Sequence, residues 1–157
     1  MLGDYPNNYM ISSGIGKDQK YELVAFDNAL GNAKLANYNL LRVSSILPSN
    51  CVKQDTVKVK EGSPLLVAYG TYTSNRPNVT IASAVSIGIP KDKNIVGVIM
   101  EYSGECCAEE AERMVCEMAR RAMINHKIEV EEIISSSMEG FVEGGEFVSV
   151  ISAVAMW

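Results

Sequence analysis

Residues 39–48 read N-L-L-R-V-S-S-I-L-P, and this stretch decides how the rest of the chain is interpreted. Its leucine and valine residues are typical of a β-strand, and Pro48 favours an extended backbone at the residue before it. Ser44 and Ser45 are unusual in such a strand, because a buried hydroxyl group needs a hydrogen-bond partner. The stretch therefore predicts a central strand with one unexplained feature, the serine pair.

The first half of the chain predicts loops around a few short elements. Residues 1–20 are polar and rich in turn-forming residues, and we expect a surface loop there. Residues 21–26 (Y-E-L-V-A-F) predict a short strand, and Asp27 is expected to be the N-cap of a short helix. After the central strand, residues 49–63 predict a loop with one edge strand at 56–59.

The second half of the chain predicts several strands and one long helix. β-branched and aromatic residues indicate the strands, which turn-forming residues separate. The helix is the clearest element, because apolar residues recur along one stripe and acidic residues lie at its positive start. The expected elements are strands at 65–73, 79–89 and 95–102, the helix at 108–125, and strands at 128–135 and 147–156. This pattern predicts an α+β fold with helices layered on sheet.

Composition excludes several classes of protein. A length of 157 residues predicts a single domain, and a net charge of −5 argues against a nucleic-acid or anionic-membrane partner. No apolar run is long enough to cross a bilayer, and the first residues do not resemble a signal peptide, so a cytoplasmic protein is expected. The four cysteines lack the spacing of a metal finger, which predicts reduced thiols and no metal site.

Standard catalytic motifs are missing from the sequence. The chain has one histidine, His126, and its position at a helix end is better explained by the helix dipole than by a catalytic triad. Three polar features stay unexplained: Asp27 after an apolar run, the serine pair, and Glu101 at the end of an apolar strand. These are the candidates for chemistry.

Four segments of the chain resemble the pyruvoyl-dependent arginine decarboxylases. They lie in the order of that family and at its spacing, from about residue 20 onward. The matching segments are A-F-D-N-A-L (25–30), N-L-L-R-V-S-S-I-L-P (39–48), I-P-K-D-K (89–93) followed by G-V-I-M-E-Y-S-G (97–104), and A-V-A-M-W (153–157). The chain differs from the family pattern at Ala36, Tyr38 and residues 49–51, which leaves the shape of the substrate pocket open.

The resemblance implies that the chain cuts itself between Ser44 and Ser45. The Ser45 hydroxyl would attack the Ser44 carbonyl, and Ser45 would become a pyruvoyl group, the cofactor. The expected products are a beta chain of residues 1–44 and an alpha chain of residues 45–157. Asn39 matches an asparagine implicated in this step, and its side-chain amide is a suitable donor. The sequence alone favours an ordinary strand-edge role for Asn39.

The resemblance also implies roles in turnover, where the pyruvoyl ketone accepts the electrons released when carbon dioxide leaves. Glu101 matches the family's proton donor, and burial beside an apolar strand would keep its carboxyl group protonated. Asp27 matches the residue that holds the substrate guanidinium group. The remaining substrate-binding candidates are Leu23, Leu30, Ser44 and Ile46. The alternatives are a helix cap for Asp27, a strand-end ion pair for Glu101 and core packing for the apolar residues.

The implied reaction is decarboxylation of L-arginine to agmatine and carbon dioxide, which serves either polyamine biosynthesis or acid resistance. The implied assembly is a homotrimer or a dimer of trimers, with sites between subunits and with sheets sandwiched by helices in each one. Two alternatives remain: a decarboxylase of another amino acid that uses the same cofactor, and an unprocessed, non-enzymatic oligomeric binding protein.

Overall fold

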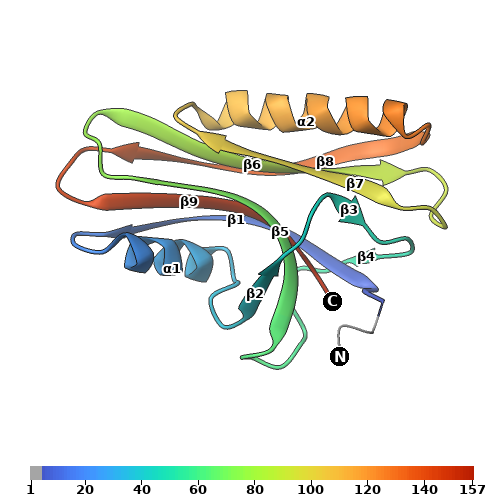
Figure 1. Ribbon diagram of the computed structural model, residues 1–157, viewed down its shortest axis with the longest axis horizontal. Helices are drawn as coiled ribbons and strands as arrows, with labels where there is room; N and C mark the ends of the chain where they lie inside the picture. The colour runs from blue at the N-terminus through green and yellow to red at the C-terminus, as the bar shows by residue number, and fades with distance from the viewer. Residues whose placement is uncertain (1–4) are drawn as a thin grey trace.

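The computed structural model describes residues 5–157 as two stacked β-sheets with one helix on each outer surface (Figure 1). Helix α1 covers one sheet and helix α2 covers the other (Figure 1). This layering confirms the predicted single α+β domain. The elements are β1 (Asn8–Asp18), α1 (Glu22–Asn32), β2 (Asn39–Arg42), β3 (Ile46–Leu47), β4 (Val52–Lys53), β5 (Pro64–Ser74), β6 (Val79–Pro90), β7 (Gly97–Gly104), α2 (Ala108–Asn125), β8 (Val130–Val142) and β9 (Phe147–Met156).

Sheet A has a short strand at each edge, β2 and β4, and sheet B has one short edge strand, β3. Sheet A has the order β2-β5-β9-β1-β4, and sheet B has the order β3-β7-β6-β8. Most neighbours are antiparallel, but β2 pairs with β5, and β1 with β4, in parallel. Because β2 and β3 follow one another in the chain, the polypeptide crosses from sheet A to sheet B between them (Figure 1).

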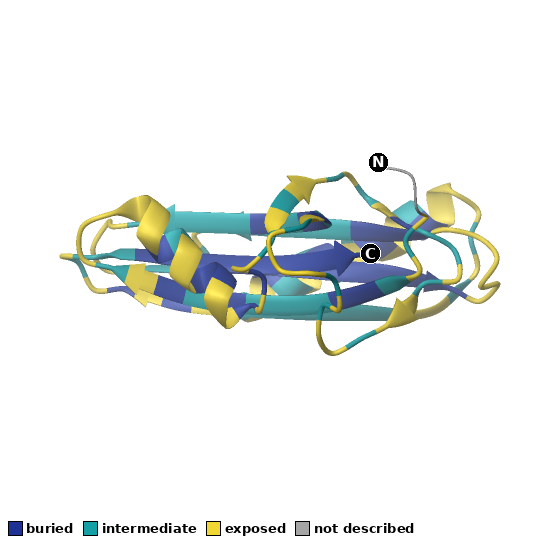
Figure 2. Ribbon diagram, turned by 90° about the horizontal axis from the view of Figure 1, so that it is seen from below, coloured by how far each residue is buried: buried dark blue, intermediate teal, exposed yellow. Residues whose placement is uncertain are grey.

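The core lies between the two sheets. Strand β9 is buried along nearly its whole length at the centre of sheet A (Figure 2). Its inner face packs on sheet B, where Val154 shares one apolar cluster with Ile87 and Ile99.

A layer of hydrogen-bonded serines interrupts this apolar core. Ser152 and Ser83 are fully buried, and their hydroxyl oxygens are 2.9 Å apart. The Ser13 hydroxyl is 2.7 Å from both Ser152 and Ser136. Each hydroxyl thus finds its partner on a strand far away in sequence, so the layer also fixes how the strands align.

Two predictions for the region before the central strand are wrong. Residues 22–26 belong to helix α1, whose N-cap is Tyr21, and Asp27 lies in its second turn. The reason is helical spacing: Ala25, Ala29 and Leu30 form the buried face, which a short apolar run does not distinguish from a strand. The start of α1 is instead supported by Asp18, whose carboxylate accepts hydrogen bonds from the Tyr21 and Lys20 amides at 2.6 and 2.9 Å.

The predicted N-terminal loop is also wrong over most of its length. Residues 1–4 lie outside the described part of the chain, but residues 8–18 form β1, which pairs with β9. Gly14 and Gly16 suggested turns, yet here they let α1 approach the sheet closely. A Cβ atom on Gly16 would lie 2.2 Å from the Ala29 nitrogen, and one on Gly14 would lie 2.3 Å from the Ala29 carbonyl oxygen.

The other elements are close to prediction, with three differences. The long helix spans the predicted residues as α2, and β5, β6, β7 and β9 match their predictions within a few residues. The predicted edge strand at 56–59 is wrong, because the short strand after the crossing is Val52–Lys53. Strand β8 continues to Val142, since Gly140 is not a turn but a position where the Ile15 side chain packs closely. The central strand is the third difference, because it divides into β2 and β3 around the serine pair.

Candidate active site

The Ser44–Ser45 bond lies where the chain crosses from sheet A to sheet B. Before the crossing, the Val43 N–H donates to the Val67 carbonyl of β5 at 3.1 Å. After it, the Ser45 carbonyl accepts from the Ile99 N–H of β7 at 2.7 Å. Ser44 is exposed and Ser45 is half-buried. The bond is thus held from both sides, one sheet before it and the other sheet after it.

Neither serine of the pair has a positive φ angle, and the bond between them is not cis. Within residues 5–157, positive φ angles outside glycine occur at Lys34, Asn50, Asn78 and Lys127, and no peptide bond is cis. Any activation of the Ser44–Ser45 bond must therefore come from its hydrogen bonding and its surroundings rather than from a left-handed backbone.

Glu101 lies on β7 and faces the space between the sheets, close to the crossing. A Cβ atom on Gly70 of β5 would lie 3.3 Å from the Glu101 Cβ, so the two sheets are close there. Glu101 is two residues beyond Ile99, whose N–H binds Ser45, and two strand residues span about 7 Å. Burial raises the pKa of Glu101, and the positive charge of Arg42 opposes this shift. Burial therefore favours the protonated form.

Arg42 lies on the same crossing and is tied to β5. Its Nη2 donates to the Tyr69 carbonyl oxygen at 2.7 Å, and its guanidinium carbon lies 4.4 Å from the centre of the Tyr69 ring. Arg42 and Tyr69 were not among the site residues predicted from the sequence. The available signal was an arginine in an apolar strand, two residues before the serine pair.

An apolar hollow of about 260 Å³ lies next to the serine pair. Ser44 and Ile46 line it, and both are substrate-binding candidates. The Ile46 side chain is 41% exposed, so it can contact a ligand. The other lining residues are Pro6, Val43, Pro48, Leu66 and Met156.

Asn39 lies at the far end of β2 from the serine pair. Its side-chain amide donates to the Gly62 carbonyl oxygen at 2.8 Å. Ser44 is five positions after Asn39 along the chain, which corresponds to about 16 Å of extended backbone. One chain therefore does not bring Asn39 to its own Ser44–Ser45 bond.

Asp27 and Leu23 lie on the exposed side of α1, one turn apart. Leu23 is 74% exposed and lines an open groove between α1 and β5, together with Phe26 and Tyr69. Leu30 differs from them because it is buried in the core beneath α1. An exposed leucine beside an exposed carboxylate is an unusual helix surface, and it suits contact with a ligand or with another copy of the chain.

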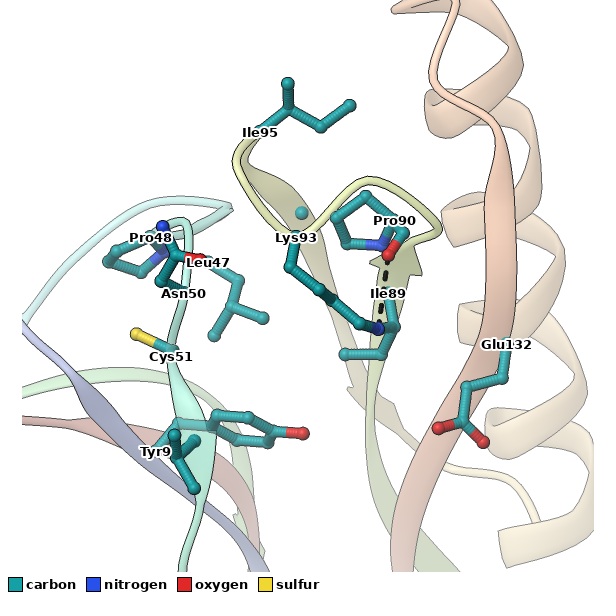
Figure 3. Close-up of a pocket in the computed structure, with 12 residues that line it drawn as sticks. Tyr9, Leu47, Pro48, Asn50, Cys51, Ile89, Pro90, Lys93, Ile95 and Glu132 are labelled. Carbon is teal, nitrogen blue, oxygen red and sulfur yellow. Dashed lines mark hydrogen bonds between the residues drawn. The ribbon is translucent and has the colours of Figure 1, made fainter.

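A second cleft, of about 430 Å³, lies at the end of the sandwich beside the β6–β7 turn (Figure 3). Its wall includes Tyr9, Glu132 and Lys93 (Figure 3). The Lys93 ammonium group is already engaged, since it donates to the Pro90 carbonyl and pairs with Glu131. Burial raises the pKa of Tyr9, and the charge on Glu132 adds to this effect. The cleft is separate from Glu101, which lies farther along β7.

Two further findings concern metal ions and membranes. Within residues 5–157, His, Cys, Asp and Glu side chains do not gather in threes around a point where a metal ion could bind. In the same part of the chain, neither helix is both long and apolar enough to span a membrane.

Comparison with known proteins decides the family. The family model for pyruvoyl-dependent arginine decarboxylase matches residues 8–157. The chain belongs to this family. The pyruvoyl-dependent arginine decarboxylase of Methanocaldococcus jannaschii is 38% identical over 152 residues, which cover 97% of this chain and 90% of that protein. The one from Thermococcus kodakarensis is 38% identical over 119 residues, 75% of each chain.

A solved structure supports the fold of this pyruvoyl-dependent decarboxylase. The structure of pyruvoyl-dependent histidine decarboxylase at pH 8 aligns with a TM-score of 0.53 and 18% identity, over 66% of this chain and 54% of that one. Family membership identifies the chain as a pyruvoyl-dependent enzyme, and its cofactor is a pyruvoyl group. Ser45 at the crossing between the sheets and the half-buried carboxyl group of Glu101 nearby are suitable residues for forming and using such a group.

Proposed function

We propose that this protein decarboxylates L-arginine to agmatine and carbon dioxide, with a pyruvoyl group formed from Ser45. The observation that carries the proposal is the crossing itself. It holds the Ser44–Ser45 bond between two sheets, and it lies about two strand residues from the half-buried Glu101. Relatives at 38% identity are named as decarboxylases of arginine.

Formation of the cofactor starts with the Ser45 hydroxyl group. Its oxygen attacks the Ser44 carbonyl carbon, the C–N bond breaks, and the nitrogen takes up a proton, which leaves an ester. Loss of the Ser45 α-proton then expels the Ser44 carboxylate, and water replaces the nitrogen, which leaves as ammonia. The products are residues 1–44, ending in a carboxylate, and residues 45–157, beginning with the ketone.

Turnover needs an electron sink and a proton donor. The pyruvoyl ketone supplies the electron sink when the substrate amine binds to it. Glu101 supplies the proton to the substrate Cα after carbon dioxide leaves, since burial favours its neutral, proton-carrying form. Ile46 and the Ser44 end of the cut chain line the apolar hollow, which suits the methylene groups of the substrate.

Recognition of the guanidinium group is assigned to Asp27 of a neighbouring copy. A carboxylate can accept two hydrogen bonds from a guanidinium group, and Asp27 lies exposed beside the exposed Leu23. Asn39 also lies far from the serine pair of its own chain. We therefore propose a trimer, or a dimer of trimers, in which α1 and Asn39 of one copy complete the site of the next. Leu30 supports α1 from below.

The cytoplasm is the proposed compartment. Cys51, Cys106, Cys107 and Cys116 are free thiols in the structure, and such thiols persist where the surroundings are reducing.

The test is the mass of the denatured, purified protein, followed by an assay of carbon dioxide release. We expect two fragments that correspond to residues 1–44 and 45–157, the larger one resistant to Edman sequencing, and release of carbon dioxide from arginine. Ser45→Ala should stay intact and inactive. A wild-type chain that stays whole after long incubation and releases no carbon dioxide would refute the proposal and favour a binding protein. If the cleaved protein decarboxylates neutral amino acids as fast as arginine, the pyruvoyl cofactor stands but arginine is not its specific substrate.

A further inference from the structure

The pairing between β2 and β5 stops just before the serine pair. The register runs in parallel from Asn39 opposite Pro64 to Arg42 opposite Val67, and the Val43 N–H still reaches the Val67 carbonyl. In a parallel ladder the next bond of this series comes two residues later on each strand. Had β2 continued, the Ser45 N–H would donate to the Tyr69 carbonyl.

The side chain of Arg42 takes the place of the Ser45 N–H at the Tyr69 carbonyl. Its Nη2 donates to the Tyr69 carbonyl at 2.7 Å, while the rest of the guanidinium group stacks on the Tyr69 ring. Ser45 has moved to the other sheet, where its carbonyl accepts from Ile99. The carbonyl at which β2 leaves β5 is therefore satisfied by a side chain instead of by the backbone.

With the Tyr69 carbonyl occupied by Arg42, the backbone N–H of Ser45 has no partner in the β-ladder. Within residues 5–157, no hydrogen-bond acceptor is found for the Ser45 N–H, whereas the neighbouring backbone groups of Val43 and Ser45 are paired. In the proposed cleavage this nitrogen is the leaving group. It must change from a planar amide to an amine that takes up a proton. A ladder hydrogen bond would hold the amide in its planar form and would have to break first.

We propose that Arg42 is a positioning residue for self-cleavage, which occupies the Tyr69 carbonyl so that the Ser45 amide stays outside the β-ladder. The inference rests on the proposed cleavage between Ser44 and Ser45. In the proposed step Arg42 itself forms and breaks no bond. Arg42 acts through the path of the backbone.

The first test is the rate of cleavage of freshly translated precursor. Arg42→Met keeps the stem of the side chain and removes the donors, and we expect cleavage to slow by about tenfold or more. Arg42→Lys retains one donor and should recover most of the wild-type rate. Arg76→Met is the matched control, because Arg76 is an exposed arginine paired with Glu105 in the loop after β5, and it should cleave at the wild-type rate.

The second test separates positioning from a general loss of structure. In uncleavable Ser45→Ala precursor, the amide of residue 45 should exchange its hydrogen rapidly with solvent. In the double variant Arg42→Met, Ser45→Ala, the same amide should become protected about tenfold or more, because it can now pair with the Tyr69 carbonyl. If Arg42→Met does not fold, Arg42→Gln replaces it, since its shorter side chain ends before the Tyr69 carbonyl.

The outcomes distinguish this inference from the proposed function. Wild-type precursor that never cleaves removes the proposed function and the inference together. Wild-type cleavage with an equally fast Arg42→Met variant, or with unchanged exchange at residue 45, overturns only the role of Arg42. Slow cleavage together with new protection supports it.

Discussion

Replacing Gly16 by alanine should push helix α1 away from sheet A. The added Cβ atom would lie 2.2 Å from the Ala29 nitrogen and 2.4 Å from the Ala25 carbonyl oxygen, whereas ordinary contact begins at 3.4 Å. Both are backbone atoms, so the helix itself must retreat by about 1 Å. Such overpacking costs about 1–3 kcal/mol or more, and this should lower the midpoint of thermal unfolding by several degrees.

The displacement also predicts a specific defect in function. Helix α1 carries Leu23 and Asp27, so a shift of 1 Å should raise KM for arginine while self-cleavage at the β2–β3 crossing continues. Gly31→Ala is the control on the same helix, because its Cβ atom meets nothing within 4 Å. It should stabilise the helix by about 0.5–1 kcal/mol. The measurements are the thermal unfolding midpoint and the KM for arginine of both variants. A Gly16→Ala protein as stable and as active as Gly31→Ala would refute the close packing of α1 on sheet A.

Three further substitutions test the core and the site. Glu101→Gln should still be cleaved, but its rate of carbon dioxide release should fall about 10²-fold. In the wild type, burial raises the pKa of Glu101, so the carboxyl group keeps its proton to a higher pH than a free glutamate. Activity should fall as the pH rises through this raised pKa, because the carboxyl group then loses the proton that it donates. Asp27→Ala should raise KM for arginine far more than it slows cleavage, measured by kinetics beside fragment analysis; an unchanged KM would remove its role. Ser152→Val should cost about 1–3 kcal/mol in urea unfolding, because the fully buried Ser83 hydroxyl loses its partner; a neutral result would show that the serine layer can rearrange.

The sequence predicted long, regular elements and failed where glycine or a short apolar run had two possible meanings. Helix α2 was predicted correctly because its apolar stripe repeats over five turns at helical spacing. Strand β1 was missed because Gly14 and Gly16 are typical of turns, whereas their role here is to admit a helix. The first half of helix α1 was predicted as a strand because only Ala25, Ala29 and Leu30 mark the buried face of the helix.

The candidate site was predictable only in part, because its parts depend on tertiary contacts. The serine pair and Glu101 stood out as polar residues in apolar surroundings, and the fold brings them to neighbouring strands. The role proposed for Arg42 could not be predicted, since it depends on the point where β2 leaves β5. The separation of Asn39 from the serine pair likewise follows from the strand geometry, and it is the reason for invoking a second copy.

The place of β1 within sheet A has a consequence for how the mature enzyme can be assembled. Residues 1–44 supply β1, α1 and β2, and β1 pairs with β9 from Tyr9 opposite Met156 to Asp18 opposite Phe147. If the bond is cut as proposed, the beta chain (residues 1–44) stays hydrogen-bonded to the alpha chain (residues 45–157) within sheet A. A precursor folds with both pieces on one tether, but unfolded mature enzyme must bring two separate polypeptides together, so its recovery should depend on protein concentration. The precursor would therefore fold as a single chain, whereas the cleaved enzyme, once unfolded, would refold poorly at low protein concentration.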